Sequence, residues 1–434
     1  MLVLSLTLLA AGHLVAAPGP IQAQRRAAVL NRLGANLLIA PSQDAFKSDD
    51  QAGFQQATDF YYLTGLDDVV GGLLVLDGST ARSALFLPKA NPSITRPALP
   101  PTPEVAQRMA VDEVWSVDSL GPWLERHLPN VSGVLVSPTD LRGAVSAPVP
   151  MANGVIRWGH YLTSLGYRGT VSSAIPIVRP LREIKDADEI ATLARVGTAS
   201  GTAMLAGIRG LRPGRFQRAV EVDIIGACVH SGARASFWPW AMTGPHAVFT
   251  DLFNSFVDYE GHNRAMKAGE VARVDVGCQL DHYMGDVGRT APVSGRFTAG
   301  QREAWDLFIA GYRAGLVVLK NGAKTVDVYQ AALDRIRALA HGLTTPMGKR
   351  AAEILLGPTG TQAWEIHGVG LDDAEGLPET LRAGMTVAYE LMFAVDGDGF
   401  YLEDMILIEP NGYRLLTPGL PYTAAEIEAA GGRR

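Results

Sequence analysis

Two pairs of acidic residues end apolar segments of this chain, and each pair follows the same short phrase of a basic residue, alanine and glycine. The phrase begins eight residues before Asp275 and again eight residues before Glu390. A second acid follows each after a short return, 11 residues later at Asp286 and 13 residues later at Glu403. Carboxylates at the ends of apolar strands are costly to bury unless positive charge meets them. The repeated spacing therefore predicts that the four acids surround a cationic group.

His367 lies between the two acidic pairs and is followed by a glycine-containing segment. Four acids and one imidazole directed at one point would repel each other strongly unless divalent metal ions neutralised them. An acid at the end of one strand is more often a turn former or a solvated side chain, and that interpretation of Asp275 stays open. The paired spacing and the intervening histidine favour a metal site.

These residues carry a resemblance to a known superfamily. In the order Asp275, Asp286, His367, Glu390 and Glu403 they resemble the five-ligand dinuclear site of the methionine aminopeptidase, Xaa-Pro aminopeptidase and prolidase superfamily. The matching strings are residues 274–278, 285–290, 367–372 and 402–404. Upstream, residues 59–65 resemble the signature of the aminopeptidase P N-terminal domain, and residues 180–186 resemble the junction into its catalytic domain.

The resemblance implies an exopeptidase with two divalent metal ions that hydrolyses short peptides, either an Xaa-Pro aminopeptidase or a prolidase-like enzyme. It implies that Asp286 and Glu403 bridge the ions, that Asp275 completes one ligand set, and that His367 and Glu390 complete the other. Glu390 is then the best catalytic proton acceptor for the attacking water. An oxygen-rich ligand set suits Mn²⁺ first, with Co²⁺, Zn²⁺ or Fe²⁺ as alternatives.

The surroundings of this ligand set depart from the family pattern. Three histidines that aminopeptidase P relatives place around the metals align here with Asp258, Ala363 and Ala374, and Tyr401 stands where relatives carry arginine. We expect His246 to take the catalytic place of the absent imidazoles, and a loop histidine without a role is the alternative. The departures also motivate two other hypotheses, a non-catalytic metal-stabilised binding protein and a metal-free creatinase-like C–N hydrolase.

Three further features near these residues have two interpretations each. Trp238, Trp240 and Phe249 form either a wall of the substrate site or ordinary loop packing. Arg289 is expected to be a buried structural partner of an acid rather than a catalyst. The cysteines, Cys228 and Cys278, are expected to be buried free thiols, although one disulfide would be compatible with export.

The elements that must position these residues fall into two domains, which gives an α/β (α+β) fold class. Residues 24–175 alternate short apolar runs with helical stretches, including a hairpin that turns at Asp77, and they predict a mixed α/β domain. An extended segment around residues 175–181 leads to a long helix capped by Asp186. Residues 181–420 then repeat the order of long helix, second helix and acid-bearing strand pair. This repeated order of elements and the family resemblance together imply a pseudo-twofold pita-bread domain.

Composition limits the partners and the compartment. The net charge of −6, without a dense run of lysine or arginine, gives no face for nucleic acid. Residues 1–23 are apolar and end in proline, glycine and alanine, which is typical of a signal peptide cleaved after Ala23; a plain apolar arm is the alternative. We therefore expect a periplasmic or secreted protein with no membrane span in the mature chain. We also expect a homo-oligomer that acts on short peptides.

Overall fold

The computed structural model describes residues 20–43, 54–88, 99–138, 154–248, 258, 260–358 and 364–432. The chain divides into two compact units, Met1–Leu181 and Arg182–Arg434. Most of the expected signal peptide lies outside the described residues, and residues 20–23 already belong to helix α1 (Pro20–Leu33). No helix in the described ranges combines the length and the apolarity needed to cross a bilayer.

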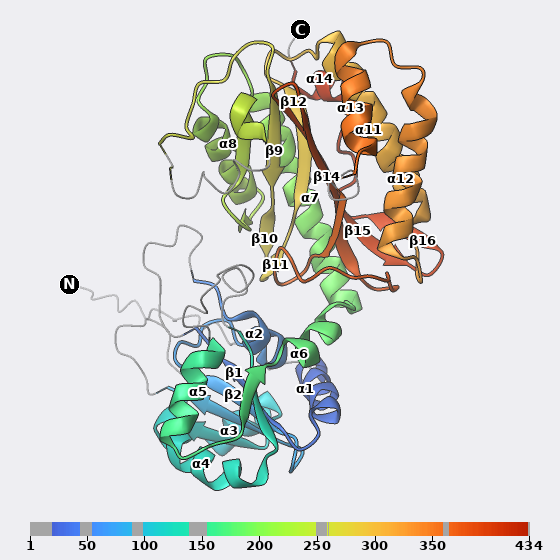
Figure 1. The fold of residues 1–434 in the computed structure, drawn as a ribbon. Helices are drawn as coiled ribbons and strands as arrows, with labels where there is room; N and C mark the ends of the chain where they lie inside the picture. Colours follow the sequence, from blue (N-terminus) through green and yellow to red (C-terminus); the bar gives the residue numbers. More distant parts are fainter. Residues whose placement is uncertain are drawn as a thin grey trace, which may run out of the picture. The chain divides into compact units, whose positions relative to one another are not determined.

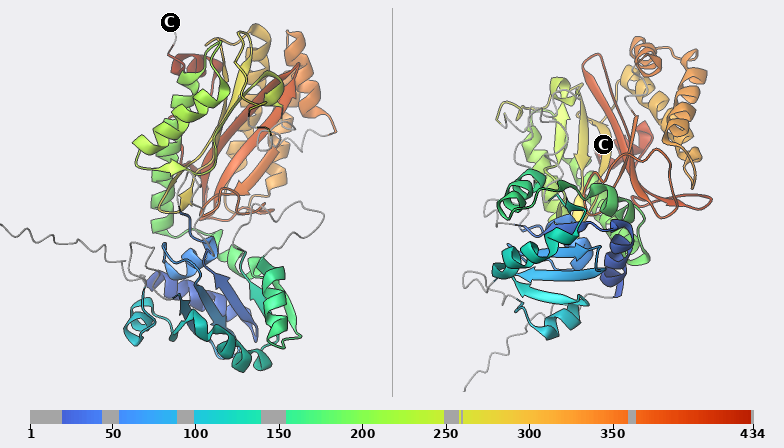
Figure 2. Two further views of the ribbon diagram at one scale, coloured as in Figure 1. Left: turned by 90° about the vertical axis from the view of Figure 1, so that its left-hand side faces the viewer. Right: turned by 60° about the horizontal axis from the view of Figure 1, so that its bottom comes forward.

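The N-terminal unit is a mixed α/β domain, as the sequence predicts. Its described strands form one sheet in the order β4-β3-β2-β1-β5-β6, in which β1 pairs antiparallel with β2 and parallel with β5 (Figure 2). The predicted hairpin is confirmed, because β2 and β3 are antiparallel neighbours on either side of residues 78–81. The elements after α1 are β1 (Leu37–Pro41), α2 (Thr58–Thr64), β2 (Leu73–Asp77), β3 (Arg82–Leu87), α3 (Pro103–Met109), β4 (Glu113–Ser116), α4 (Leu120–His127), β5 (Gly133–Val136), α5 (Gly154–Ser164) and β6 (Thr170–Ser173).

The segment between the two domains differs from the expectation. It forms helix α6 (Ile175–Arg182) rather than an extended linker. Pro176 occupies the first turn, where a helix needs no backbone donor, so that its ring is tolerated there. Pro180 removes one helical hydrogen bond without breaking this short helix.

The second unit shows the predicted internal repeat. Its main sheet has the order β13-β14-β15-β12-β9-β8, and β16 pairs with β15. Helices α7 and α8 precede β9 and β12, and α11 and α12 precede β14 and β15, so the two halves meet at the pairing of β12 with β15 (Figure 1). The glycines of the repeated phrase, Gly269 and Gly384, have φ values of 87° and 89°, a left-handed conformation that favours glycine.

The bounds of this unit place the long helices where the sequence predicts them. Asp186 caps α7 with a reciprocal bond from Glu189, and Thr298 caps α11 in the same way with Gln301. The elements are α7 (Ala187–Gly210), α8 (Gln217–His230), β7 (Arg234–Ala235), β8 (Trp240–Thr243), the 3₁₀ helix η3 (Gly244–Ala247), β9 (Val271–Val276), β10 (Cys278–Leu280), β11 (Tyr283–Met284), β12 (Val287–Pro292), α11 (Ala299–Val318), α12 (Thr325–Ala340), α13 (Pro346–Leu356), β13 (Trp364–Gly368), β14 (Thr386–Val395), β15 (Asp398–Glu409), β16 (Gly412–Leu415) and α14 (Ala424–Ala430).

Helices cover one face of the main sheet. On α11, the ring of Tyr312 stacks on the ring of Tyr389, with the ring centres 4.4 Å apart. On α7, a Cβ added to Gly207 would lie 3.1 Å from the side chain of Val274. Tyr389 and Val274 each precede a candidate ligand by one residue, and successive side chains of a strand point to opposite faces. The candidate ligands therefore lie on the face that these helices leave uncovered.

The two cysteines correct an expectation. Cys228 on α8 and Cys278 on β10 form a disulfide with a Cα–Cα distance of 5.5 Å, so neither is a free thiol. Both residues are fully buried, as expected. Their separation of 50 residues in the chain hid their proximity, which arises because α8 packs against β7, and β7 pairs with β10.

Candidate metal centre

The register of the main sheet aligns three of the acids. Asp275 on β9 is opposite Gly288 on β12, Gly288 is opposite Glu403 on β15, and Glu403 is opposite Glu390 on β14. Directly opposed residues of antiparallel strands share a face, so the three carboxylates point to the same side. The glycine in this row leaves room between the strands that carry Asp275 and Glu403.

The other two candidates join the row from neighbouring segments. His367 lies on β13, and its Nε2 is 3.4 Å from Oε1 of Glu403, 3.8 Å from Oε1 of Glu390 and 4.0 Å from Oδ2 of Asp286. Asp286 just precedes β12, within electrostatic reach of Glu403 and Asp275, whose charges add to burial in raising its pKa. All five residues selected from the sequence are therefore brought together.

The cluster carries more negative charge than its own residues can balance. Burial, followed by the charge of Glu403, raises the pKa of Asp275 to about 7 and that of Glu390 to about 8. The same two causes raise the pKa of Asp286 well above its usual value. Burial alone would lower the pKa of His367, but the carboxylates of Glu403 and Glu390 beside it raise it to about 10. These shifts are the expected response of acids crowded together away from water.

The donor set fits divalent cations. Oδ1 of Asp275 and Oε1 of Glu403 are buried and have no hydrogen-bond partner within the described chain. Asp286, His367 and Glu403 each offer one ligand atom, and these atoms all lie within 4.8 Å of one another. Carboxylate oxygens with one imidazole are the ligands of hard and intermediate divalent metals.

A tyrosine and an arginine border this cluster. Tyr401 precedes Glu403 by two residues on β15, and its hydroxyl donates to Oε2 of Glu403 at 2.6 Å. The guanidinium carbon of Arg273 lies 4.8 Å from the centre of the Tyr401 ring. Sequence reasoning gave Arg273 no role. One feature of the sequence could have indicated that Arg273 belongs to the site. It is a charged residue two positions before Asp275, and it therefore lies on the same face of an otherwise apolar strand.

His246 lies beyond the row of acids. It belongs to η3, after β8, where Gln217 is 3.3 Å from its Nδ1 and the ring of His262 is 4.5 Å away. Thr243 at the end of β8 is opposite Ala272, three residues before Asp275 along β9. These contacts do not support a catalytic role for His246, and that role stays a prediction.

The remaining candidates have different positions. Asp258 is exposed and accepts a hydrogen bond from the backbone of Gly261 at 2.9 Å, and Ala374 is exposed. Trp240 is opposite Asp275 in the sheet register, which places one tryptophan of the expected wall beside the acids. Trp238 donates to the buried Glu221 at 2.7 Å, whereas Ala363 and Phe249 lie outside the described residues.

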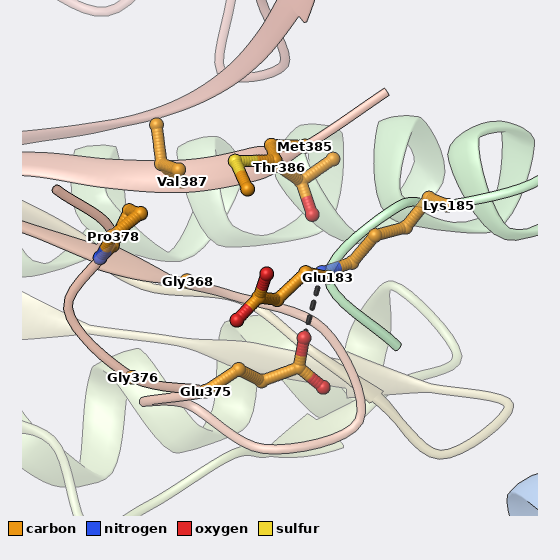
Figure 3. Close-up of a pocket in the computed structure, with 9 residues that line it drawn as sticks. All are labelled: Glu183, Lys185, Gly368, Glu375, Gly376, Pro378, Met385, Thr386 and Val387. Carbon is orange, nitrogen blue, oxygen red and sulfur yellow. Dashed lines mark hydrogen bonds and ion pairs between the residues drawn. The ribbon is translucent and has the colours of Figure 1, made fainter. Parts of the chain in front are cut away.

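A buried ionic network holds the loop after His367. Oε1 of Glu375 is 2.6 Å from Arg182, and its Oε2 is 2.6 Å from Lys185. Glu375 also bonds through its backbone to Gly368, the residue after His367. Figure 3 shows the small pocket beside this network, with the Lys185–Glu375 contact on one side and Val387 on the other. The network fixes the segment that presents the histidine to the acids.

Arg289 has the structural role that the sequence predicts. It is fully buried and lies 2.7 Å from Asp404. It also donates to the carbonyls of Glu403 and Pro421 at 2.6 and 2.8 Å. Because Arg289 and Asp404 each adjoin a residue of the acidic row, they lie on the helix-covered face of the sheet.

A pseudo-twofold sheet that gathers four acids and one imidazole on one face defines the class of pita-bread metallopeptidases. The chain matches metallopeptidase family M24 over residues 191–410 and the aminopeptidase P N-terminal domain over residues 22–135. It therefore belongs to metallopeptidase family M24 and is a metal-dependent exopeptidase. Nothing in the site or in its relatives supports the binding-protein or the creatinase-like hypothesis.

Similar proteins cover the whole described architecture. Xaa-Pro aminopeptidases of Haemophilus influenzae and Escherichia coli are each 24% identical, over 93% and 94% of this chain and 95% and 96% of their own. Proline aminopeptidase P II from Yersinia pestis has the same fold, with a TM-score of 0.75, 22% identity, and coverage of 95% of this chain and 99% of its own. Aminopeptidase PepP from Pseudomonas aeruginosa gives a TM-score of 0.75 at 20% identity, covering 96% and 99%.

Proposed function

We propose that this protein is a manganese-dependent aminopeptidase that removes the first residue of short peptides whose second residue is proline. The observation that carries the proposal is the joint presence of both domains. The relatives named Xaa-Pro aminopeptidase align over nearly their full length, with the N-terminal domain as well as the catalytic one. A prolidase that cleaves only dipeptides is the alternative that the experiment must separate.

The five clustered residues, Asp275, Asp286, His367, Glu390 and Glu403, would together hold the ions. Divalent ions bound there would activate a water for attack on the amide and would stabilise negative charge on the amide oxygen. Glu390 would accept the proton from the attacking water, because its carboxylate borders the cluster 3.8 Å from His367. Trp240 would form an apolar wall beside Asp275.

The proposal includes action in the periplasm or outside the cell. The Cys228–Cys278 disulfide supports it, because disulfides persist in oxidising compartments. N-terminal sequencing of the protein from its native host tests this part, with a mature chain that begins near Gln24 as the expected result. A homo-oligomer is also proposed, and light scattering of the purified protein measures it.

Digestion of three peptides, Ala-Pro-Ala, Ala-Pro and Ala-Ala-Ala, tests the activity. We expect the metal-free protein reloaded with Mn²⁺ to convert Ala-Pro-Ala into alanine and Pro-Ala, identified by mass, faster than it releases alanine from Ala-Ala-Ala. Cleavage of Ala-Pro alone would replace the proposal by a prolidase. The absence of hydrolysis, or release from the carboxyl end, would refute it. An Asp286→Asn protein, purified in parallel, controls for contaminating peptidases.

A further inference from the structure

We propose that Arg273 and Tyr401 act together as a positioning pair that fixes the carboxylate of Glu403 for metal binding. The inference rests on the proposed role of Glu403 as a metal ligand. It adds two residues to the site, neither of which needs to touch substrate.

The hydrogen bond from Tyr401 decides how Glu403 is oriented. The hydroxyl of Tyr401 donates to Oε2 of Glu403 at 2.6 Å. The other oxygen, Oε1, therefore lies toward Nε2 of His367, at 3.4 Å. Tyr401 is 2% exposed and Glu403 is fully buried, so water cannot easily replace the hydroxyl. A carboxylate held through one oxygen keeps the rotation that presents the other oxygen to the cluster.

The sheet is built to admit the tyrosine ring. A Cβ added to Gly288 would lie 1.9 Å from Cε1 of Tyr401, so a larger residue at position 288 would displace the ring. Gly288 is opposite both Asp275 and Glu403, and the ring therefore lies across β12 between the two ligand-bearing strands. The Tyr401 backbone is fixed as well, because its N–H donates to the hydroxyl of Thr290 at 2.7 Å.

Arg273 holds the other side of the ring. It is 2% exposed and lies on the ligand face two residues before Asp275. Its guanidinium carbon is 4.8 Å from the ring centre, a distance at which a cation is attracted to an aromatic face. The stacked charge restricts the ring and strengthens donation by its hydroxyl to the anionic Glu403.

The opposite face of the sheet contains a matching triad that is purely structural. The guanidinium carbon of Arg289 is also 4.8 Å from the ring centre of Tyr422, whose hydroxyl is also 2.6 Å from an acid, Asp404. There the arginine pairs with the acid directly, and its Nε donates to a backbone carbonyl.

The triad on the ligand face, Arg273, Tyr401 and Glu403, differs because two of its polar atoms have no hydrogen-bond partner among the described residues. Nε of Arg273 and Oε1 of Glu403 are buried without a hydrogen-bond partner within the described residues. Buried polar groups in a structural network are normally satisfied. Oε1 of Glu403 lies 3.4 Å from Nε2 of His367 without a hydrogen bond, which indicates a ligand that the described residues do not supply. The pair of Arg273 and Tyr401 determines where that oxygen points.

Manganese binding by the metal-free full-length chain tests the pair. We expect Tyr401→Phe to weaken Mn²⁺ binding, measured by titration calorimetry, by roughly 10- to 100-fold, the usual effect of losing a partner of a ligand. The matched control is Tyr422→Phe, which removes the equivalent bond on the other face. It should lower the melting temperature and leave Mn²⁺ affinity within about twofold of the original protein, because Asp404 is not a ligand.

Arginine variants test the second member of the pair. Arg273→Met should weaken Mn²⁺ binding, and Arg273→Lys should recover part of the loss because it keeps the charge. The double variant Arg273→Met/Tyr401→Phe should lose less than the product of the two single effects, because the residues act through one carboxylate. The arginine variants also carry the test if Tyr401→Phe does not fold.

Unchanged Mn²⁺ affinity in Tyr401→Phe would overturn the inference, and so would an equal loss in Tyr422→Phe. Failure of the unsubstituted protein to bind Mn²⁺ would instead refute the proposed function on which the inference rests.

Discussion

Nζ of Lys185 lies 2.6 Å from Oε2 of Glu375, and each side chain is 2% exposed. Arg182 lies at the same distance from the other oxygen of Glu375, so one buried carboxylate is shared by two cations. Burial alone would raise the pKa of Glu375, but Lys185 and Arg182 outweigh it and lower that pKa to about 2. The network fixes the loop after His367 although none of its members belongs to the acidic cluster.

We expect Glu375→Gln to destabilise the protein by about 3 kcal/mol at pH 7, because a pKa lowered from 4.5 to about 2 corresponds to that free energy. The carboxylate contributes this stability above pH 4.5, and the contribution is lost as the pH falls toward 2. Chemical denaturation between pH 7 and pH 3 measures both effects. Glu379→Gln, at an exposed acid of the same segment, is the control. Equal acid sensitivity of Glu375→Gln and the original protein would contradict the prediction.

Removal of the metal should make stability fall as the pH rises. In the metal-free protein Asp275 and Glu390 have pKa values of about 7 and 8, above their unfolded values of 3.8 and 4.5. His367 has a pKa of about 10 against 6.5 when unfolded. Over these windows the folded state binds more protons than the unfolded state, and stability therefore declines from about pH 4 to pH 10. Melting temperatures of chelator-treated protein measure the decline.

Saturating Mn²⁺ should reverse this trend, because metal binding requires deprotonated ligands and therefore strengthens with pH. The difference in melting temperature between the loaded and the metal-free protein should widen from pH 5 to pH 8. A constant difference over this range would contradict the assignment of these acids as ligands.

Asp286→Ala should remove at least one metal ion and abolish hydrolysis, and Glu403→Ala should do the same. The resemblance implies that both ions share these two acids, so neither ion would keep its full ligand set. Elemental analysis of the purified variants gives the metal content. Asp281→Ala, at an exposed acid that pairs with Arg195, is the control. A variant that retained two ions and activity would show that the ligand assignment is wrong.

Loss of the Cys228–Cys278 disulfide should cost about 2–5 kcal/mol of stability, because the bond restricts the unfolded chain. The double substitution to alanine should melt at a lower temperature than the oxidised protein. It should also be insensitive to a reductant, whereas the original protein should lose stability when it is reduced during unfolding. A reductant-insensitive original protein would mean that the cysteines are not bonded in solution.

The role of His246 is decided by kinetics. If it replaces the absent imidazoles, His246→Ala should lower kcat at least about tenfold, roughly 1.4 kcal/mol of transition-state stabilisation, without changing metal content. His262→Ala is the matched control, because its ring contacts that of His246. A normal kcat in His246→Ala would mean that His246 is a loop residue without a catalytic role. Tyr401 would then be the candidate to replace the absent imidazoles.

Local sequence determined most of the elements and the identity of the acidic cluster. Asp186 with Glu189 specifies the start of α7, because a capping box is made within one turn. Asp275 and Glu390 could be recognised because each lies on an apolar strand after the same glycine turn. The expected position at a strand end holds for Asp275 and is wrong for Glu390, which lies in the middle of β14. Such features depend on neighbours in the chain, and the chain displays them directly.

Tertiary structure decided which residues meet across strands and helices. The alternation of a strand places Arg273 and Tyr401 on the ligand face, but only the pairing of β12 with both β9 and β15 brings the two side chains together over β12. The bonding of Cys228 to Cys278 likewise depends on how α8 packs against the strands. These contacts join residues far apart in sequence, and they are set by the packing of whole elements rather than by local preference.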